Sequence, residues 1–341
     1  MRVAVVGAAG AVGREMVRTL EERAFPVDDL GLFATERSAG KRVRFRDETA
    51  TVEAYRDGAL EGFDLALFSA GSAAARAIAP SAAAAGTVCI DNSSAFRMEP
   101  DVPLVIPEIN ADALASHRGI IANPNCTTIT ALMAVGPLHR AAGLRQLVMS
   151  SYQSVSGSGM KGVRELAEQN EKLAGMEEQL VAPDHDALPV GDVYGKTVAF
   201  NVLPFQFTAA ELAWTDEERK VLLESRKILS APDLEIAATV VRVPVVVGHA
   251  VSMFAAFSRP ITPAEAREVL SSAPGVRVVD DPANAEYPTP LDSAGIDAVL
   301  VGRIRAIDDR EDALLLFAAG DNLRKGAALN AVQIAEALPA S

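Results

Sequence analysis

The chain has 341 residues, of which 49% are hydrophobic and 23% charged, an ordinary composition for a folded protein of two domains. Its 32 Lys and Arg against 45 Asp and Glu give a net charge of −13, which argues against nucleic acid or a membrane surface as a general partner. Two cysteines exclude a disulfide scaffold. No apolar run approaches the roughly 20 residues of a membrane span, and Met1 leads directly into a strand pattern, so we expect a cytoplasmic protein.

The first third of the chain alternates strand and helix patterns. Apolar strand patterns lie at 2–6, 30–34, 64–69, 87–91 and 119–122, and helical patterns lie at 11–23, 72–85 and 127–141. This alternation predicts an α/β domain with a parallel, doubly wound sheet.

The pattern changes near residue 145. A strand at 146–155, a helix at 159–173, an irregular stretch at 181–196, a helix at 215–229, a β-rich stretch at 234–258 and a final helix at 322–338 are predicted in that order. We therefore expect an α+β second domain on a mostly antiparallel sheet, with the last helix packed on the first domain. The predicted division is 1–127 with 321–341, and 128–320.

A glycine-rich segment, Gly7-Ala8-Ala9-Gly10-Ala11-Val12-Gly13, stands between the first strand and the first helix. Gly7 permits a tight turn, Gly10 lets a pyrophosphate approach the backbone, and Gly13 lets the helix pack on the strand. The N–H groups at the start of a helix attract phosphate. We predict a dinucleotide site, with a glycine-lined packing turn as the alternative.

The residues after the second strand distinguish NAD from NADP. An acidic side chain there accepts the ribose 2′-hydroxyl of NAD, whereas a cation with hydroxyl groups holds the 2′-phosphate of NADP. Arg37 can offer a bidentate fork, with Lys41 close by. Thr35 and Ser38 can donate hydrogen bonds, whereas Glu36 favours NAD. The balance predicts NADP.

Cys126 lies in Asn123-Pro124-Asn125-Cys126-Thr127-Thr128, at a strand-to-helix turn. The helix dipole lowers the pKa of a thiol there, and first-turn N–H groups can receive a developing oxyanion. We therefore predict a nucleophile. Cys89, inside an apolar run, is expected to be a small buried side chain.

A nucleophile needs a proton partner, and the chain has four histidines. His117 and His139 lie beside arginines and are expected on the surface. His185 lies between two aspartates but has no further spaced ligands, so we predict an exposed loop and no metal site.

His249 follows Gly248 at the end of a long apolar β pattern, where a buried structural histidine is the usual interpretation. Arg242 lies seven residues earlier in the same stretch. A guanidinium is seldom placed there without an anion to bind, so the pair favours a functional site.

Two further cations favour an anionic substrate. Arg97 follows the fourth strand, at the sheet edge where such folds bind ligands. Lys220 lies in the first turn of the helix near 215 and can bind a phosphate as a point charge, although a solvated helix residue is the ordinary alternative.

Eight separated segments together closely resemble the aspartate-semialdehyde dehydrogenase family. In family order they are Gly7–Gly13, Arg37–Lys41, Asn92–Met98, Pro103–Asn110, Asn123–Thr128, Tyr152–Gly157, Arg242–Val245 with Gly248–His249, and Asp321–Ala328. The resemblance spans nearly the whole chain. It implies a Rossmann-like dinucleotide-binding domain and a catalytic and dimerisation domain, assembled as a homodimer or tetramer.

The resemblance also implies the reaction: NADP-dependent, reversible reductive dephosphorylation of L-4-aspartyl phosphate to L-aspartate 4-semialdehyde and inorganic phosphate. The product feeds lysine, diaminopimelate, threonine and methionine biosynthesis.

Site residues follow from the resemblance as well. Cys126 is then the acyl-thioester nucleophile, His249 the acid and base, and Gln153 the residue that orients the substrate. Arg242 is expected to hold the α-carboxylate, and Glu217 the amino group. The phosphate is expected on Arg97 and Lys220. The NADP site is expected to include Gly7, Ala9, Gly10, Ala11, Val12, Gly13, Thr35, Arg37, Ser38, Ser156, Gly157 and Asn322.

The chain departs from the family pattern at three places, one of which is Glu36, where a small residue is common. The family usually follows Gly-His with Ser-Glu, whereas Ala250 and Val251 stand here, and the segment 175–216 fits poorly. Two other interpretations stay open: a sister acyl-phosphate reductase, such as N-acetylglutamyl-phosphate reductase, and a catalytically silent relative. Glu217 argues against the first, because an acetylated nitrogen carries no charge. The retained Cys126, His249 and Gln153 argue against the second.

Overall fold

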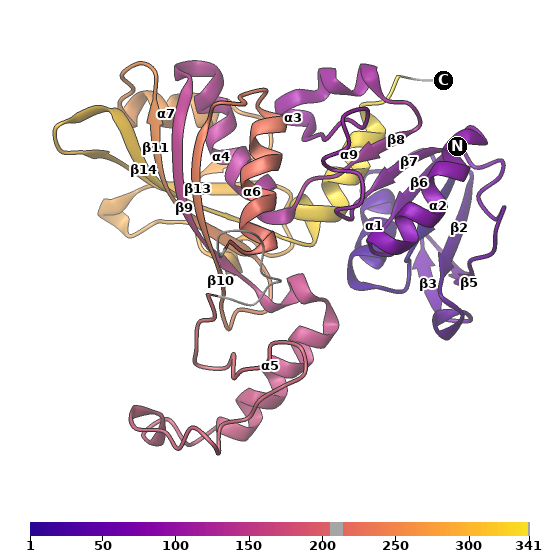
Figure 1. Cartoon of the computed structure of the whole chain (residues 1–341), viewed down its shortest axis with the longest axis horizontal. Coiled ribbons are helices and arrows are strands. Elements are labelled where there is room, and N and C mark those ends of the chain that lie inside the picture. Colours follow the sequence, from indigo (N-terminus) through magenta and orange to yellow (C-terminus); the bar gives the residue numbers. More distant parts are fainter. Residues whose placement is uncertain (205–213, 340–341) are drawn as a thin grey trace.

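The first body of the molecule is built on a parallel sheet, as the sequence predicts. The computed structural model describes residues 1–204 and 214–339 (Figure 1). The strand order is β5-β2-β1-β6-β7-β8, with parallel pairing throughout. These strands are β1 (Arg2–Val6), β2 (Asp29–Ala34), β5 (Glu53–Ala54), β6 (Leu65–Phe68), β7 (Val88–Asp91) and β8 (Ile120–Ala122). A separate hairpin, β3 (Arg42–Phe45) with β4 (Glu48–Thr51), lies beside them.

Helices cover both faces of this sheet because its strands are apolar on both sides. Helix α1 (Ala11–Glu22) packs on the face that carries Val3 and Val5, and α2 (Ser72–Ala84) packs on the face that carries Ala4 and Val6. The strand order reverses between β1 and β6. A reversal of this kind leaves a crevice beyond the carboxyl ends of the two strands, where ligands bind.

The second body is a six-stranded mixed sheet in the order β10-β9-β11-β14-β13-β12. Its strands are β9 (Leu144–Gln153), β10 (Glu235–Arg242), β11 (His249–Phe257), β12 (Val276–Val278), β13 (Val299–Ile307) and β14 (Arg310–Gly320). The central pairs are antiparallel, as predicted, but both edge strands pair in parallel. The β-rich stretch at 234–258 is consequently not a hairpin, because β9 lies between β10 and β11.

One face of the mixed sheet is covered by helices α4 (Cys126–Ala142), α6 (Asp216–Ile228) and α7 (Pro263–Ser271). Almost every residue of α4 is buried, so this helix is the centre of the second core. The opposite face carries Val148 and Tyr152, both exposed, with the Tyr152 ring 6.1 Å from that of Phe317.

Residues 154–204 leave the sheet as a projection (Figure 1). It contains a 3-10 turn (Val155–Ser158), α5 (Met160–Leu173) and a second short turn (Gln179–Val181), held by its own small apolar cluster. The poorly matching segment 175–216 falls partly here, and its residues 205–213 lie outside the described residues.

The C-terminal segment returns to the first body in a helical stretch of residues 324–336, close to the predicted 322–338, but its first turn is π-helical. A turn at Asp321 leads into a π-helical turn (Arg324–Ala328) and then α9 (Leu329–Glu336), which packs on α1. The Asp321 carboxylate accepts the backbone N–H groups of Leu323 and Arg324, as a capping side chain does at the start of a helix.

Two buried cations, Lys325 and Arg324, hold this C-terminal segment against the rest of the protein. The Lys325 ammonium is fully buried and donates to Glu108, Asn330 and Gln333. Arg324 pairs with carboxylates of both bodies: Glu15 and Glu22 on α1, and Asp297 before β13.

Within residues 1–204 and 214–339, no helix has the length and apolar character needed to cross a membrane.

Candidate active site

Cys126 is the first residue of α4, directly after the β8 strand, so the predicted strand-to-helix turn is confirmed. Asn125 caps the helix: its Oδ1 accepts the N–H groups of Thr127 at 2.9 Å and Thr128 at 3.3 Å. These two groups are therefore already bonded, and the prediction that first-turn N–H groups await an oxyanion is wrong for them. Cys89 is fully buried, as expected.

The electrostatic environment of Cys126 differs from the prediction. Burial, and next the negative charge of Glu217, raise the pKa of the thiol to about 11, against the opposing effects of Arg97 and Arg242. The lowered pKa expected from the helix N-terminus is thus wrong, because desolvation outweighs the dipole. At neutral pH the group is a thiol, and it needs a base.

His249 begins β11 and is only 1% exposed. Its Nδ1 lies 3.1 Å from both the backbone nitrogen and the Oγ of Ser154. Its Nε2 has no hydrogen-bond partner within the described part of the chain. Burial, and next the charge of Arg242, lower the pKa of His249 to about 3. The ring is therefore neutral at physiological pH and can take up a proton.

Three neighbouring strand ends bring the remaining polar groups together. Gln153 ends β9, with Arg242 opposite it on β10. On the other side of β9, His249 begins β11 next to Ala250, which pairs with Tyr152, the residue before Gln153. Gln153 Nε2 donates to Thr127 Oγ1, and Arg242 Nη1 donates to the Ser154 carbonyl. The sheet order therefore places His249, Gln153 and Arg242, predicted as the acid–base, orienting and carboxylate-binding residues, at the same end of three adjacent strands.

Gly157 contributes by lacking a side chain. A Cβ there would lie 3.1 Å from Arg242 Nη1 and 3.4 Å from His249 Nε2. The contact with Arg242 is tighter than an ordinary one, so a side chain at this position would push the guanidinium aside by a few tenths of an ångström. Gly157 thus preserves space beside the two functional side chains.

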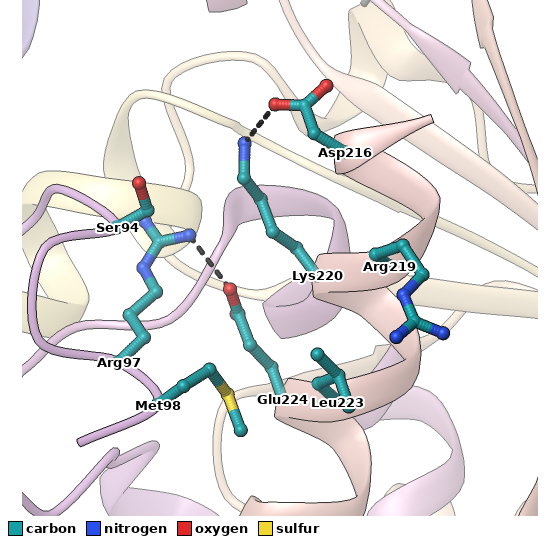
Figure 2. A pocket seen from close by; sticks show the side chains of 8 residues that line it. All are labelled: Ser94, Arg97, Met98, Asp216, Arg219, Lys220, Leu223 and Glu224. Carbon is teal, nitrogen blue, oxygen red and sulfur yellow. Dashed lines mark hydrogen bonds and ion pairs between the residues drawn. The ribbon is translucent and has the colours of Figure 1, made fainter. Parts of the chain in front are cut away.

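A pocket of about 510 Å³ lies between the loop after β7 and helix α6 (Figure 2). It is lined by Ser94, Arg97, Met98, Asp216, Arg219, Lys220, Leu223 and Glu224. The structure therefore brings the two predicted phosphate ligands, Arg97 and Lys220, into one pocket. Sequence reasoning missed Arg219.

The Arg97 guanidinium is fixed by three hydrogen bonds of 2.9 Å. They run to the carbonyls of Asn92 and Asn123 and to Glu224 Oε1. A guanidinium has five N–H groups, so two are left to bind an anion. Figure 2 shows Arg97 approaching from the loop while Glu224 meets it from α6.

Glu224 is a site residue that sequence reasoning missed. It is almost fully buried, and its Oε2 also accepts the Asn125 N–H at 2.7 Å. It lies seven residues after Glu217 on α6, a spacing that puts both carboxylates on one helix face and could have identified it. Glu217 accepts the Asn125 amide at 2.8 Å and the Lys220 ammonium at 2.6 Å.

A larger cleft, of about 900 Å³, lies at the β1–β6 reversal. The predicted residues Gly7, Ala9, Gly10, Ala11, Thr35, Arg37 and Ser38 line it, together with Lys41. Glu36, on the same turn, is exposed and does not line it. Sequence reasoning missed Arg14 and, from the second body, Lys161 and Arg164. The cleft therefore gathers cations in a chain whose net charge is negative.

The glycine motif has the geometry that a dinucleotide turn requires. Gly7 has a φ of +93°, and a Cβ at Gly13 would lie 2.3 Å from the Gly7 carbonyl oxygen. Gly10 caps α1 and stays exposed. Val12 and Gly13 support the turn from behind rather than lining the cleft, and Ser156, Gly157 and Asn322 lie beside His249 instead. The cleft thus fits a nicotinamide dinucleotide.

The other histidines have structural surroundings. His185 is exposed, as predicted, and His117 and His139 are partly exposed. Their Nδ1 atoms accept the backbone N–H groups of Gly119 and Leu144. Among the described residues, no group of three or more His, Cys, Asp or Glu side chains is arranged to hold a metal.

A dinucleotide cleft beside a cysteine and a buried neutral histidine defines a class of protein: nicotinamide-dependent oxidoreductases with a cysteine nucleophile. Residues 2–117 match the semialdehyde dehydrogenase NAD binding domain, and residues 135–325 match the semialdehyde dehydrogenase dimerisation domain.

The relatives narrow this class to one family. The aspartate-semialdehyde dehydrogenase of Aquifex aeolicus is 46% identical over 99% of this chain and 97% of its own. That of Streptomyces akiyoshiensis is 48% identical over 100% and 99%. A solved structure of aspartate semialdehyde dehydrogenase II from Vibrio cholerae, complexed with ASA, has a TM-score of 0.92 and 40% identity, covering 99% and 97%. The chain belongs to the aspartate-semialdehyde dehydrogenase family, and it is an NAD(P)-dependent enzyme.

Replacement of Arg37 by Ala should raise the KM for NADP far more than the KM for NAD. A charge-assisted hydrogen bond contributes about 1.5–3 kcal/mol, so we expect roughly a 10- to 100-fold increase with NADP only. Steady-state kinetics with both cofactors measures this. Arg42→Ala is the matched control, because Arg42 is an exposed arginine nearby that does not line the cleft. Equal effects on both cofactors would place the 2′-phosphate elsewhere.

Replacement of Glu217 by Gln should lower the pKa of Cys126, because the Glu217 charge raises it. Below the pKa, each unit of decrease gives about tenfold more thiolate. Alkylation of Cys126 by iodoacetamide at pH 8 should accordingly become faster. Asp216→Asn, which removes the neighbouring carboxylate, should leave the rate unchanged. A slower reaction in Glu217→Gln would show that the Glu217 charge does not act on the thiol.

Proposed function

We propose that this chain catalyses the NADPH-dependent reduction of L-4-aspartyl phosphate to L-aspartate 4-semialdehyde and inorganic phosphate, and the reverse reaction. The observation that carries the proposal is the position of Cys126. The charges of Arg242, Glu217 and Arg97 all act on its thiol. Arg242 and Glu217 suit the two charges of an amino-acid head group. Arg97 lines the 510 Å³ pocket, which also contains Arg219 and Lys220 and suits a phosphate. A substrate with a zwitterionic head and a phosphate tail matches this charge pattern.

The head group is recognised by opposite charges. Arg242 offers a guanidinium to the α-carboxylate, a geometry that binds carboxylates well. Glu217 offers a carboxylate to the α-ammonium group. The nitrogen of an N-acetylated substrate is uncharged and would leave the buried Glu217 charge without that partner, so we favour the free amino acid over the substrate of a sister acyl-phosphate reductase.

The chemical step begins with a proton transfer. His249 Nε2 takes the thiol proton while the electron pair stays on sulfur, and the thiolate attacks the acyl carbon. The bond to the phosphate oxygen then breaks, leaving a thioester on Cys126, and the phosphate leaves on Arg97 and Lys220. Gln153, tied to Thr127, orients the carbonyl. NADPH, when bound, supplies the hydride that reduces the thioester.

His249 then returns its proton to the oxygen of the reduced carbon, which gives a thiohemiacetal on Cys126. When the carbon–sulfur bond breaks, its electron pair goes to sulfur, and His249 takes the hydroxyl proton and passes it to the sulfur, which releases the aldehyde and restores the Cys126 thiol. Acid–base help of this kind contributes about 10²–10⁴ in rate. The proposal assigns cofactor binding to 1–127 with 321–341, and catalysis with subunit contact to 128–320.

We further infer a homodimer formed through the open face of the mixed sheet. The exposed Val148 and Tyr152, with the Phe317 ring beside them, give this face an apolar strip. Exposed apolar surface of this kind marks subunit interfaces. The matching dimerisation-domain model covers these strands.

A cytoplasmic location fits the chemistry because a reducing compartment keeps Cys126 a thiol. The product is proposed to serve lysine, diaminopimelate, threonine and methionine biosynthesis, with no role for nucleic acid or membrane.

Replacement of Cys126 by Ala should abolish turnover. In the oxidative direction, wild type should reduce NADP with L-aspartate 4-semialdehyde only when phosphate is present, and the variant should show no activity, because no thioester can form. Absorbance of NADPH measures both. Cys89→Ala is the control, since Cys89 is buried away from the site.

Activity that persists in Cys126→Ala would exclude the covalent route. Wild-type activity with the acetylated semialdehyde alone would identify a sister reductase, and no activity with either substrate would favour the silent relative.

Replacement of Val148 by Glu should dissociate the dimer, because an unpaired carboxylate would be buried in the interface at a cost of several kcal/mol. Light scattering should give about twice the chain mass of 35.8 kDa for wild type and a single chain mass for the variant. Val181→Glu is the matched control, because Val181 is 87% exposed on the projection. A wild-type mass for Val148→Glu would move the interface elsewhere.

A further inference from the structure

Ser154 contacts the catalytic machinery through three different groups. Its backbone N–H donates to His249 Nδ1 at 3.1 Å, its carbonyl accepts from Arg242 Nη1, and its hydroxyl oxygen lies 3.1 Å from His249 Nδ1. Ser154 is itself fully buried. Its side chain therefore meets no bulk water, and each of these contacts is made in a desolvated setting.

The Ser154 hydroxyl is in turn oriented by Asn322, the second residue after β14. Asn322 Oδ1 accepts from Ser154 Oγ at 3.0 Å, from Ser156 Oγ at 3.2 Å and from the Gly248 N–H at 2.9 Å. Asn322 Oδ1 can only accept, so Ser154 Oγ is the donor between these two atoms, and in that arrangement a lone pair of its oxygen is left for His249 Nδ1. The pair Ser154–Asn322 can thus act as an acceptor for an Nδ1 proton.

Whether the group that contacts Nδ1 donates or accepts a hydrogen bond decides which ring nitrogen of His249 carries the proton. Proton exchange at Nε2 requires a ring that keeps a proton on Nδ1, since a neutral ring with its proton on Nε2 has no lone pair there. The Ser154 backbone N–H favours that inert form because it donates to Nδ1. The Ser154 hydroxyl opposes it because it can accept from Nδ1–H.

We propose that Ser154 is a positioning residue whose hydroxyl keeps the Nδ1 atom of His249 protonated, so that Nε2 is left to exchange protons with Cys126 and the substrate oxygen. This inference rests on the acid–base role proposed for His249.

The proton balance is simple. When the S–H bond of Cys126 breaks, its electron pair stays on sulfur and the proton bonds to Nε2. The ring then carries one positive charge, with Nδ1–H on Ser154 Oγ and the Ser154 proton on Asn322 Oδ1. No proton travels along Ser154 or Asn322.

Arg242, from β10, is the charged group that acts on the His249 ring, and it opposes protonation of the ring. A thiolate formed on Cys126, from α4, attracts the charged ring that takes its proton. Glu217, from α6, acts on Cys126 and Arg242, and the Gly248 carbonyl supports the charged ring. The hydroxyl of Ser154 adds to this backbone support, so its loss should weaken acid–base catalysis without abolishing it.

Four variants test the role in the full-length enzyme: Ser154→Ala, Ser154→Thr, Ser154→Val and Ser151→Ala. Thr and Val have nearly the same shape, and only Thr keeps the hydroxyl. Ser151 is the matched control because it is a buried serine on β9 whose Oγ has no partner in the described structure. The measurements are kcat, KM and the pH profile of kcat with L-aspartate 4-semialdehyde, phosphate and NADP.

We expect Ser154→Ala and Ser154→Val to lower kcat by about 10- to 100-fold, less than the whole acid–base contribution, with KM nearly unchanged. Losing an acceptor for Nδ1–H destabilises the charged ring, so the pH limb set by His249 should move to lower pH. Ser154→Thr should keep both the rate and the limb, and Ser151→Ala should match wild type.

Wild-type kcat and pH profile in both Ser154→Ala and Ser154→Val would overturn the inference. Equal losses in Thr and Val, with an unmoved pH limb, would also overturn it, because a packing defect would then explain the loss. His249→Asn separates the two levels of the argument. If that variant stays active, the proposed role of His249 fails; if it is inactive while the Ser154 variants behave as wild type, only this inference fails.

Discussion

The position of helix α4 is the constraint on which the rest of the structure depends. The helix starts where the parallel sheet ends, and its body forms the core of the mixed sheet, so its N-terminus cannot move without disturbing both bodies. Asn125 caps it, and two carboxylates of α6, Glu217 and Glu224, hold Asn125. Cys126, the first residue of the helix, is therefore placed by the packing of two sheets and by hydrogen bonds from a third element.

In the free enzyme, most of the ionisable side chains around Cys126 are paired with opposite charges or are neutral. Arg97 is paired with Glu224 and Lys220 with Glu217, while Cys126 and His249 are neutral because burial penalises their ions. The reacting pair becomes charged only by exchanging a proton with each other, which costs less in a desolvated site than creating one isolated ion. These ion pairs and the burial of Cys126 and His249 therefore determine the charge state of the site before substrate binds.

Much of the framework was predictable because it is local. Strand and helix patterns depend on neighbouring residues, and they located the parallel sheet and the turn before Cys126 within a residue or two. Gly7 and Gly13 were predictable because no side chain fits their positions. The C-terminal helix was predicted to within about two residues at each end, but the sequence pattern did not show that its first turn, Arg324–Ala328, is π-helical.

The sequence by itself determined the α/β framework, the glycine turn, and the choice of Cys126 over Cys89, since each depends on residue type and immediate neighbours. Only the tertiary structure decided the electrostatics. The raised pKa of Cys126 comes from burial and from Glu217, which is 91 residues away in the chain, and the partners of His249 come from three segments joined by the sheet order. Desolvation and long-range pairing arise only when distant segments meet, so no local pattern encodes them.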